Sequence, residues 1–348
     1  MGRLRHSLSM SAVFAALILF FAISPLDAAP QRNPAASSAT YIKVGGVNYV
    51  DARVFFARNG FKAAWVERGK TMRFQSATNK IDIEADARDV IFNDLRVLMG
   101  EPAVFRGSTL YVSNIDADKL FLPILRPSAV AGPPAPALKV IVIDAGHGGK
   151  DTGTQNKPFK LDEKVFALDV AMRLRALLVK QGYKVVMTRT DDRFIELEKR
   201  ADIANAAGAD LFISIHFNAV AGTSAVRGSE TYVMTPRYQR STSSAKRDTS
   251  DNVMNPGNLN DPWNALLGYH MHDQVLGKLG SVDRGFKRAR FAVLRLVKSP
   301  GVLIEAGYLS NNEEAKKIAT PAYRQALADA LAQGVRAYSV ALTTVKTK

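Results

Sequence analysis

The sequence predicts an α/β fold with a mostly parallel sheet covered by helices on both faces, preceded by a small α+β domain. Two observations support this prediction. From Lys139 onward, apolar runs of strand length alternate with longer segments of helical periodicity, which is typical of consecutive βαβ units. Before residue 126, short strand-like runs predominate. The 348 residues, 47% of them hydrophobic, suffice for the cores of two domains.

Residues 1–29 have the layout of a secretory signal peptide. Arg3 and Arg5 precede an apolar run over 10–23, and small residues follow, in the order expected for such a signal. The run is short for a membrane span, so we expect cleavage after Ala28 or Ala29 and no stable membrane span afterwards. The alternative is an uncleaved N-terminal anchor. Since both carry the remaining chain across a membrane, we expect a periplasmic or extracellular protein of the cell envelope.

The chain is strongly basic and lacks cysteine. Its 47 Lys and Arg against 32 Asp and Glu give a net charge of +15, which favours polyanionic partners such as nucleic acid, anionic lipid or an acidic cell-wall polymer. No nucleic-acid-binding motif accompanies this charge, so we expect no nucleic-acid partner. The absence of cysteine excludes disulfides, thiolate metal sites and a thiol nucleophile.

Residues 40–125 are predicted to form the small α+β domain. A hairpin with a Gly-Gly turn opens it, and a helix over 51–59 follows, with Asp51 as its N-cap. A helix containing Asp116 closes the domain, which has no histidine and no clustered catalytic pattern. Between the two helices we expect strands over 62–65, 71–75, 80–83, 90–92, 95–99, 103–105 and 110–112.

A linker separates this domain from the second one. Four prolines among alanine and glycine over 126–138 indicate a semi-rigid spacer. In residues 139–345 strands and helices alternate, and the helix over 163–181 carries an apolar stripe at helical spacing. We expect strands over 140–143, 183–188, 211–215, 228–234, 291–294 and 301–304, and helices over 163–181, 195–207, 264–279 and 321–340.

Four ionisable residues share one placement in the second domain. His147, His216 and Glu305 each follow an apolar strand, and Glu163 opens the helix after the first strand. In a parallel sheet these positions meet at one edge, where open α/β sheets bind ligands. Each residue alone also fits a structural role, such as a turn, a helix-dipole acid or a residue at the core edge. Because all four residues share this placement, we favour a ligand-binding or catalytic site over four separate structural roles.

Two imidazoles and two carboxylates indicate metal-assisted hydrolysis. Two histidines and one carboxylate bind zinc well and leave a fourth position for water, which marks catalytic sites. Bound water then ionises near neutral pH. A second carboxylate can take the proton of that water and deliver it to a leaving nitrogen.

Four ordered motifs resemble a known family. They are the segments 144–153 (DAGHGGKDTG), 163–164 (EK), 214–219 (SIHFNA) and 304–311 (IEAGYLSN), and they resemble the zinc-dependent N-acetylmuramoyl-L-alanine amidases of the amidase-3 type. The resemblance implies that His147, Glu163 and His216 hold Zn²⁺ and that Glu305 is the catalytic acid/base. It also implies peptidoglycan as the partner, with cleavage of the amide between N-acetylmuramic acid and L-alanine for cell-wall remodelling or cell separation.

One residue departs from the family pattern, and some arginines follow it. Phe217 stands where the family usually has a small residue, so we expect its ring to narrow the groove or to stack on a sugar. Arg189, Arg193 and Arg200 follow the family, as structural or substrate-facing residues. The likeness of 40–125 to the copper-amine-oxidase N-terminal-like domain is weaker and implies no copper.

Two alternatives to the amidase stay open at this point: a wall-binding module with a decayed site, and a zinc carboxypeptidase on stem peptides. For the amidase, a protein activator in the envelope is a candidate partner. The polar segment 235–262 is expected to be a substrate-side loop rather than an autoinhibitory plug. Its Asn255, Asn258 and Asn260 are candidates for bonds to sugar or peptide amides, with a solvated loop as the alternative.

Overall fold

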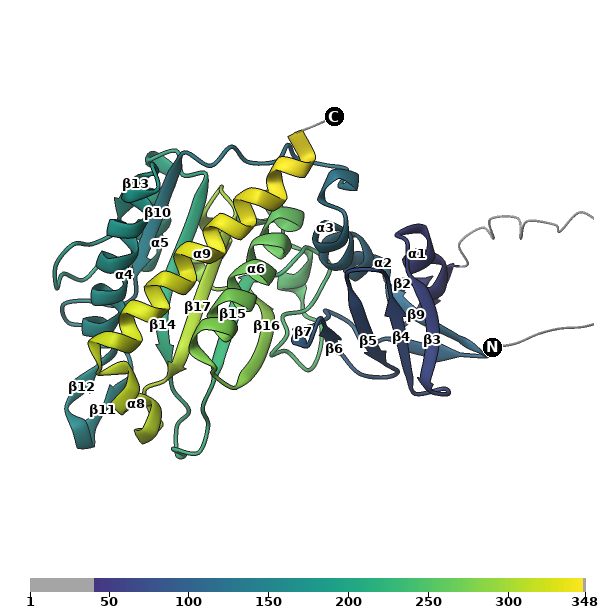
Figure 1. The fold of residues 1–348 in the computed structure, drawn as a ribbon, viewed down its shortest axis with the longest axis horizontal. Coiled ribbons are helices and arrows are strands. Elements are labelled where there is room, and N and C mark those ends of the chain that lie inside the picture. The colour runs from purple at the N-terminus through teal and green to yellow at the C-terminus, as the bar shows by residue number, and fades with distance from the viewer. Residues whose placement is uncertain (1–40, 347–348) are drawn as a thin grey trace, which may run out of the picture. The chain divides into compact units, whose positions relative to one another are not determined.

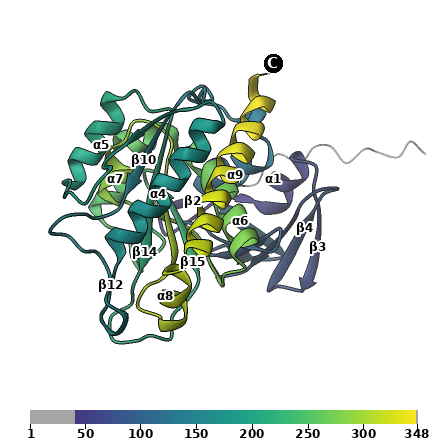
Figure 2. The same cartoon turned by 60° about the vertical axis from the view of Figure 1, so that its left-hand side comes forward.

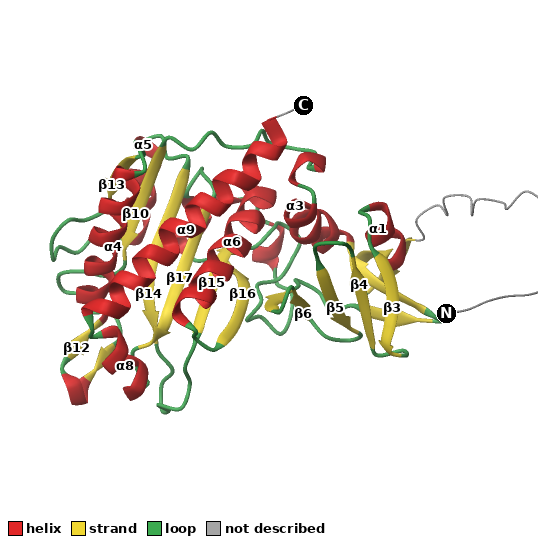
Figure 3. Ribbon diagram, viewed as in Figure 1, coloured by secondary structure: helices red, strands yellow, loops and turns green. Residues whose placement is uncertain are grey.

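The computed structural model describes residues 41–346, which belong to one compact unit (Figure 1). The predicted signal peptide lies outside the described residues. Within 41–346, no helix is both long enough and apolar enough to cross a membrane. The architecture is α/β, with one large sheet between layers of helices (Figure 3).

The large sheet runs through both predicted domains. Its strand order is β13-β10-β14-β17-β15-β16-β7-β6-β5-β4-β3. The strands of the C-terminal region are β10 (Val140–Ala145), β13 (Lys184–Met187), β14 (Leu211–Asn218), β15 (Ser229–Met234), β16 (Asp283–Ala289) and β17 (Gly301–Tyr308). Those of the N-terminal region are β3 (Lys62–Glu67), β4 (Thr71–Gln75), β5 (Lys80–Glu84), β6 (Asp89–Phe92) and β7 (Leu95–Leu98). The two groups meet where β7 pairs with β16, at Val97 and Phe286.

The prediction of a mostly parallel sheet is wrong, because the sheet is mixed and antiparallel pairings predominate among the described strands. Strands β13, β10, β14 and β17 are parallel neighbours, but β15 runs antiparallel to β17. The connection 219–228 from β14 to β15 contains no helix and is too short for the crossover that parallel strands need. Short turns likewise make β3 to β7 an antiparallel meander.

Helices cover both faces of the C-terminal part of the sheet. On one face lie α4 (Glu163–Lys180), α6 (Asp261–Leu279) and α9 (Pro321–Lys346) (Figure 1). On the other lie α5 (Leu197–Ala206) and α7 (Ala292–Leu296) (Figure 2). Two separate apolar clusters follow this division. Two local predictions were wrong here: 291–294 begins helix α7 rather than forming a strand, and strand β16 was not foreseen.

The N-terminal region adds a second, four-stranded sheet in the order β1-β2-β9-β8. Asp51 caps α1 as predicted, because its carboxylate accepts hydrogen bonds from the backbone of Arg53 and Val54. The elements are β1 (Tyr41–Val44), β2 (Val47–Asp51), α1 (Ala52–Arg58), β8 (Val104–Arg106), β9 (Thr109–Ser113), α2 (Asn114–Asp116), a π-helical turn (Ala117–Phe121) and α3 (Leu122–Leu125). Smaller elements elsewhere are β11 (Gln155–Asn156), β12 (Leu161–Asp162) and α8 (Asn312–Ile318), with single 3-10 turns between the main ones.

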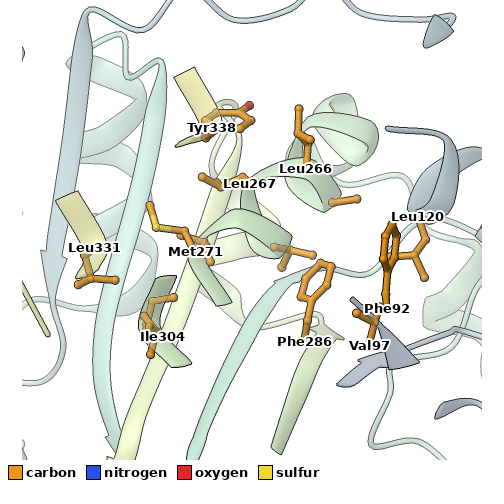
Figure 4. Packing of buried hydrophobic residues seen from close by; sticks show 14 of the residues in the cluster. Phe92, Val97, Leu120, Leu266, Leu267, Met271, Phe286, Ile304, Leu331 and Tyr338 are labelled. Carbon is orange, nitrogen blue, oxygen red and sulfur yellow. The ribbon is translucent and has the colours of Figure 1, made fainter. Parts of the chain in front are cut away.

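One apolar core extends from the N-terminal region into the C-terminal one. Phe92, Val97 and Leu120 lie beside Phe286 and Leu266 (Figure 4). All five side chains are at most 1% exposed. The N-terminal strands therefore extend the same sheet beyond β16 and share one apolar core with the region that carries the candidate site.

Candidate metal centre and active site

The end of strand β10 is fixed by a buried carboxylate. Asp144 accepts hydrogen bonds from Thr188 Oγ1 (2.7 Å), Ser214 Oγ (2.8 Å) and Arg200 Nη1 (2.8 Å). Burial alone would raise the pKa of Asp144, but the Arg200 guanidinium and the Thr188 hydroxyl hold it below the ordinary value. The carboxylate near the end of the apolar strand is therefore hydrogen-bonded, and these bonds fix the position from which the following loop starts.

Two buried arginines hold the loop after β10. Arg200 donates to the carbonyls of Ala145 (2.8 Å) and His147 (2.9 Å). Arg189 donates to the carbonyls of Ala145 (3.0 Å) and Gly146 (2.7 Å). Both side chains are about 2% exposed, so their role is structural, while the exposed Arg193 pairs with Asp191.

Glycine is required where the loop passes the site. His147 itself has a positive φ of 60°, a left-handed backbone conformation within this glycine-rich loop. A Cβ at Gly146 would lie 2.4 Å from His216 Cε1. A Cβ at Gly153 would lie 2.6 Å from His147 Cδ2 and 2.7 Å from Glu163 Oε2. These contacts exclude any side chain at either glycine without displacing the cluster.

The three predicted metal ligands converge. His216 Nδ1 lies 3.2 Å from His147 Nε2 and 2.9 Å from Glu163 Oε1. His147 Nε2 lies 3.1 Å from the same Oε1. Zinc bonds of about 2.0–2.1 Å in a tetrahedral site place ligand atoms roughly 3.3 Å apart. The donor types and their spacing therefore fit one zinc ion, and among the described residues these three form a group able to hold a metal.

Further contacts fix the orientation of the ligands. His147 Nδ1 lies 2.8 Å from Asp151 Oδ2, the carboxylate–histidine arrangement that orients metal-binding imidazoles. The backbone of Thr154 donates to Glu163 Oε2 (2.8 Å) and that of Phe217 to Oε1 (2.9 Å). Burial would raise the pKa of Glu163, but hydrogen bonds from His147 and His216 hold it below its ordinary value. Asp151 was missed at sequence level, although an acid four residues after a glycine-flanked histidine was an available signal.

Glu305 lies in a different environment from Glu163. It pairs across the sheet with His216 on one side and Glu230 on the other. Its Oε2 is buried and has no hydrogen-bond partner within 41–346. Burial, with the charges of Glu163 and Glu230 in second place, raises the pKa of Glu305 well above that of an ordinary glutamate. Such a carboxylate beside a group of metal-ligand side chains can both accept and donate a proton.

One cavity joins the four predicted residues. It has a volume of about 640 Å³, and His147, Glu163, His216 and Glu305 all line it. The opposite wall is mainly apolar and comes from α5, α7 and the segments before them. Its side chains are Phe194, Ile195, Leu197, Phe291 and Val293. An open cavity of this kind can take a ligand that combines apolar and polar parts.

Two expectations about nearby segments are corrected. The side chain of Phe217 is 0% exposed and packs against Phe166 in the core, so its ring cannot stack on a sugar. Asn258 is buried and donates to the Thr235 carbonyl (2.8 Å) and to Asp261 (3.0 Å). No residue of the segment 235–262 lines the described cavity, so its asparagines serve the internal structure.

Comparison with known proteins identifies the family. Residues 141–337 match the model of Amidase_3, described as N-acetylmuramoyl-L-alanine amidase. The amidase AmiC of Escherichia coli O6:H1 is 33% identical over 220 residues, covering 57% of this chain and 52% of that protein. The amidase CwlM of Bacillus licheniformis is 35% identical over 203 residues, covering 58% and 69%.

A solved structure, an N-acetylmuramoyl-L-alanine amidase from Clostridium difficile 630, is 33% identical, with a TM-score of 0.49 and coverage of 58% of this chain and 96% of that one. The match thus spans about half the length of AmiC and nearly all of the Clostridium chain. Since the family model covers more than half of the 348 residues, the chain belongs to the Amidase_3 family of N-acetylmuramoyl-L-alanine amidases.

Proposed function

We propose that the protein is a zinc-dependent amidase that hydrolyses the bond between N-acetylmuramic acid and L-alanine in peptidoglycan. The observation that carries this proposal is the convergence of His147, Glu163 and His216, whose ligand atoms are spaced as one metal ion requires, with Glu305 in the same cavity. Membership of the Amidase_3 family gives the substrate bond. The net charge of +15 suits an anionic envelope.

We assign separate roles in hydrolysis to the metal ligands, to Glu305 and to Asp151. His147 Nε2, His216 Nδ1 and Glu163 would hold zinc, which when bound acidifies a water molecule and polarises a carbonyl. Glu305 accepts the proton of the attacking water and donates it to the leaving amide nitrogen of L-alanine. Asp151 holds the His147 imidazole in one tautomer through the 2.8 Å contact at Nδ1. The buried position of Glu305 raises its proton affinity for this role.

The remaining parts of the chain receive proposed roles. We infer that residues 1–29 export the protein to the periplasm or the extracellular envelope. Residues 139–345 act as the catalytic domain, 126–138 as the linker, and 40–125 as a module resembling the copper-amine-oxidase N-terminal domain. A protein activator in the envelope is a further proposed partner.

Product analysis tests the proposal. Purified peptidoglycan digested by the protein is expected to release stem peptides that begin with a free L-alanine amine, leaving glycan without peptide, as mass spectrometry would detect. A chelator is expected to stop the release. Stem peptides shortened from their other end would instead identify a carboxypeptidase. Binding to the wall with no products in either condition would identify a wall-binding module.

A further inference from the structure

A cationic cluster lies beside Glu305 at the same edge of the sheet. We call it the Arg284 cluster, and it consists of Glu230 and Tyr232 on β15, Arg284 and Lys287 on β16, and Tyr308 at the end of β17. Glu230 pairs with Glu305 in register across β15 and β17. Asn218, which lines the active-site cavity, donates a hydrogen bond to Glu230 (3.2 Å). The cluster therefore borders the cavity through the lining residues Asn218 and Glu305.

The cluster has one positive charge in excess. Glu230 is 3% exposed and accepts hydrogen bonds from Lys287 Nζ (2.7 Å), Arg284 Nε (3.1 Å) and Tyr308 OH (2.7 Å). Tyr232 OH donates to its other oxygen. One carboxylate thus faces two cations, and its oxygens are already fully engaged. The remaining positive charge is therefore carried by Arg284 and Lys287.

Arg284 is the cation with donors to spare. Its Nε is used by Glu230 and Tyr308, and its guanidinium lies 5.3 Å from the centre of the Tyr308 ring. Within 41–346, neither terminal nitrogen of Arg284 donates a hydrogen bond. The side chain is 35% exposed. A pre-oriented guanidinium with free terminal nitrogens is the group that binds a carboxylate in bidentate fashion.

Arg284 lies at a distance from the metal ligands that suits the carboxylate of the second residue of a bound peptide. Strand β16 lies two strands from Glu305 and three from His216, which is roughly 10 and 14 Å at about 4.8 Å per strand. In an extended peptide, the carboxylate of the second residue lies roughly 8–9 Å from the carbonyl carbon bonded to the amine nitrogen of the first residue. The length of the Arg284 side chain covers the difference between the strand separation and this peptide span.

We propose that Arg284 binds the free carboxylate of the second stem-peptide residue and so sets the peptide specificity of the active site. This inference rests on the proposed amidase function and deepens it. Lys287 and Tyr308 act as positioning residues, because they share Glu230 with Arg284 Nε and leave the terminal nitrogens of Arg284 for the ligand. Substrates whose second residue is amidated lose this ion pair and bind more weakly.

Two matched substrates test the proposal. The disaccharide-dipeptides GlcNAc-MurNAc-L-Ala-D-Glu and GlcNAc-MurNAc-L-Ala-D-isoGln differ only in that carboxylate. The wild-type protein is expected to cleave the free acid with a kcat/KM roughly 10-fold higher, mostly through KM, as charge-assisted hydrogen bonds predict. Arg284→Gln is expected to abolish the preference, because KM for the free acid rises to the value for the amidated substrate. Arg284→Lys is expected to restore part of it.

The control removes a charge elsewhere on the same edge. Lys316 on α8 pairs with Glu313 and is 59% exposed, so Lys316→Gln is expected to keep the wild-type preference. A preference that survives in Arg284→Gln, or an equal loss on both substrates, would overturn the inference. So would a wild-type protein that cleaves walls but shows no preference between the dipeptides, a result that needs no variant. A wild-type protein that cleaves neither walls nor dipeptides would contradict the proposed function instead.

Discussion

At the scale of single residues, two carboxylates in opposite environments define the site. Hydrogen bonds from two histidines hold the pKa of Glu163 below its ordinary value. Burial without a partner for Oε2 raises the pKa of Glu305. Environments that separate the pKa values of neighbouring acids commonly mark a division of roles. Here the lowered pKa of Glu163 suits a metal ligand, and the raised pKa of Glu305 suits an acid/base.

Replacing Glu305 separates these two roles. The Glu305→Gln variant keeps the shape of the side chain but cannot take up a proton, so kcat is expected to fall roughly 10²- to 10⁴-fold. Its zinc content, measured by atomic emission, is expected to equal that of the wild type. A variant that cleaves peptidoglycan at the wild-type rate would remove Glu305 from the chemistry, and loss of zinc would make it a ligand.

Replacing Asp151 tests the orientation of His147. In Asp151→Asn the Nδ1 partner no longer carries a charge, so zinc affinity is expected to fall roughly 10- to 100-fold. Competition with a chromogenic chelator measures this change. Asp162→Asn provides a control, because Asp162 is also near Glu163 but pairs with the exposed Gln155. Equal affinities in wild type and Asp151→Asn would show that the contact does not act on the metal.

At the scale of elements, placement after apolar strands and at a helix start predicted that His147, Glu163, His216 and Glu305 meet, and the family resemblance indicated which three hold the metal. Strand β16 could not be predicted, because four of its seven residues are charged. Arg284 and Lys287 face Glu230, and Arg288 is buried against Asp116, so partners that are distant in sequence make this polar segment a strand. The run 291–294 is short and apolar, a pattern that fits a strand or a helix equally well.

The buried Asp261 at the start of α6 has a raised pKa. Burial raises the pKa of Asp261 to about 6, against the hydrogen bond from Asn258 that lowers it. The folded state then binds more protons than the unfolded state between about pH 4 and 6, so the free energy of unfolding falls as pH rises through this range. Asp261→Asn is expected to remove up to about 3 kcal/mol of this fall.

Urea unfolding of both proteins at pH 4 and pH 8 measures the effect, and their difference cancels every other titrating group. The wild type is expected to lose more stability than Asp261→Asn between the two pH values. Identical changes in the two proteins would show that Asp261 titrates normally.

At the scale of the whole molecule, the N-terminal region is joined to the amidase region by more than the linker. Strand β7 extends the sheet from β16, and Phe92 and Val97 pack beside Phe286 (Figure 4). The ion pair between Arg288 and Asp116 (3.1 Å) crosses the same boundary with both side chains at most 2% exposed. Linker composition indicated a spacer at 126–138, but it could not reveal these contacts, because they join segments more than 150 residues apart.

Breaking the buried ion pair tests this union. Asp116→Ala leaves the charge of Arg288 buried without its partner, and is expected to lower the free energy of unfolding by about 3–5 kcal/mol. Asp94→Ala is the matched control, since Asp94 pairs with Lys80 at the surface with 82% of its side chain exposed, and a loss below about 1 kcal/mol is expected. Equal losses in urea unfolding would show that the boundary contributes no special stability.

The central claim is that His147, Glu163 and His216 bind one zinc ion that the amidase reaction requires. Titration of zinc into metal-free protein, with amide cleavage of peptidoglycan as the readout, tests it most directly. Activity is expected to rise linearly and to level off at one equivalent of zinc, and Glu163→Gln is expected to need a large excess. Full activity of the metal-free protein, or a titration that Glu163→Gln reproduces unchanged, would contradict the claim.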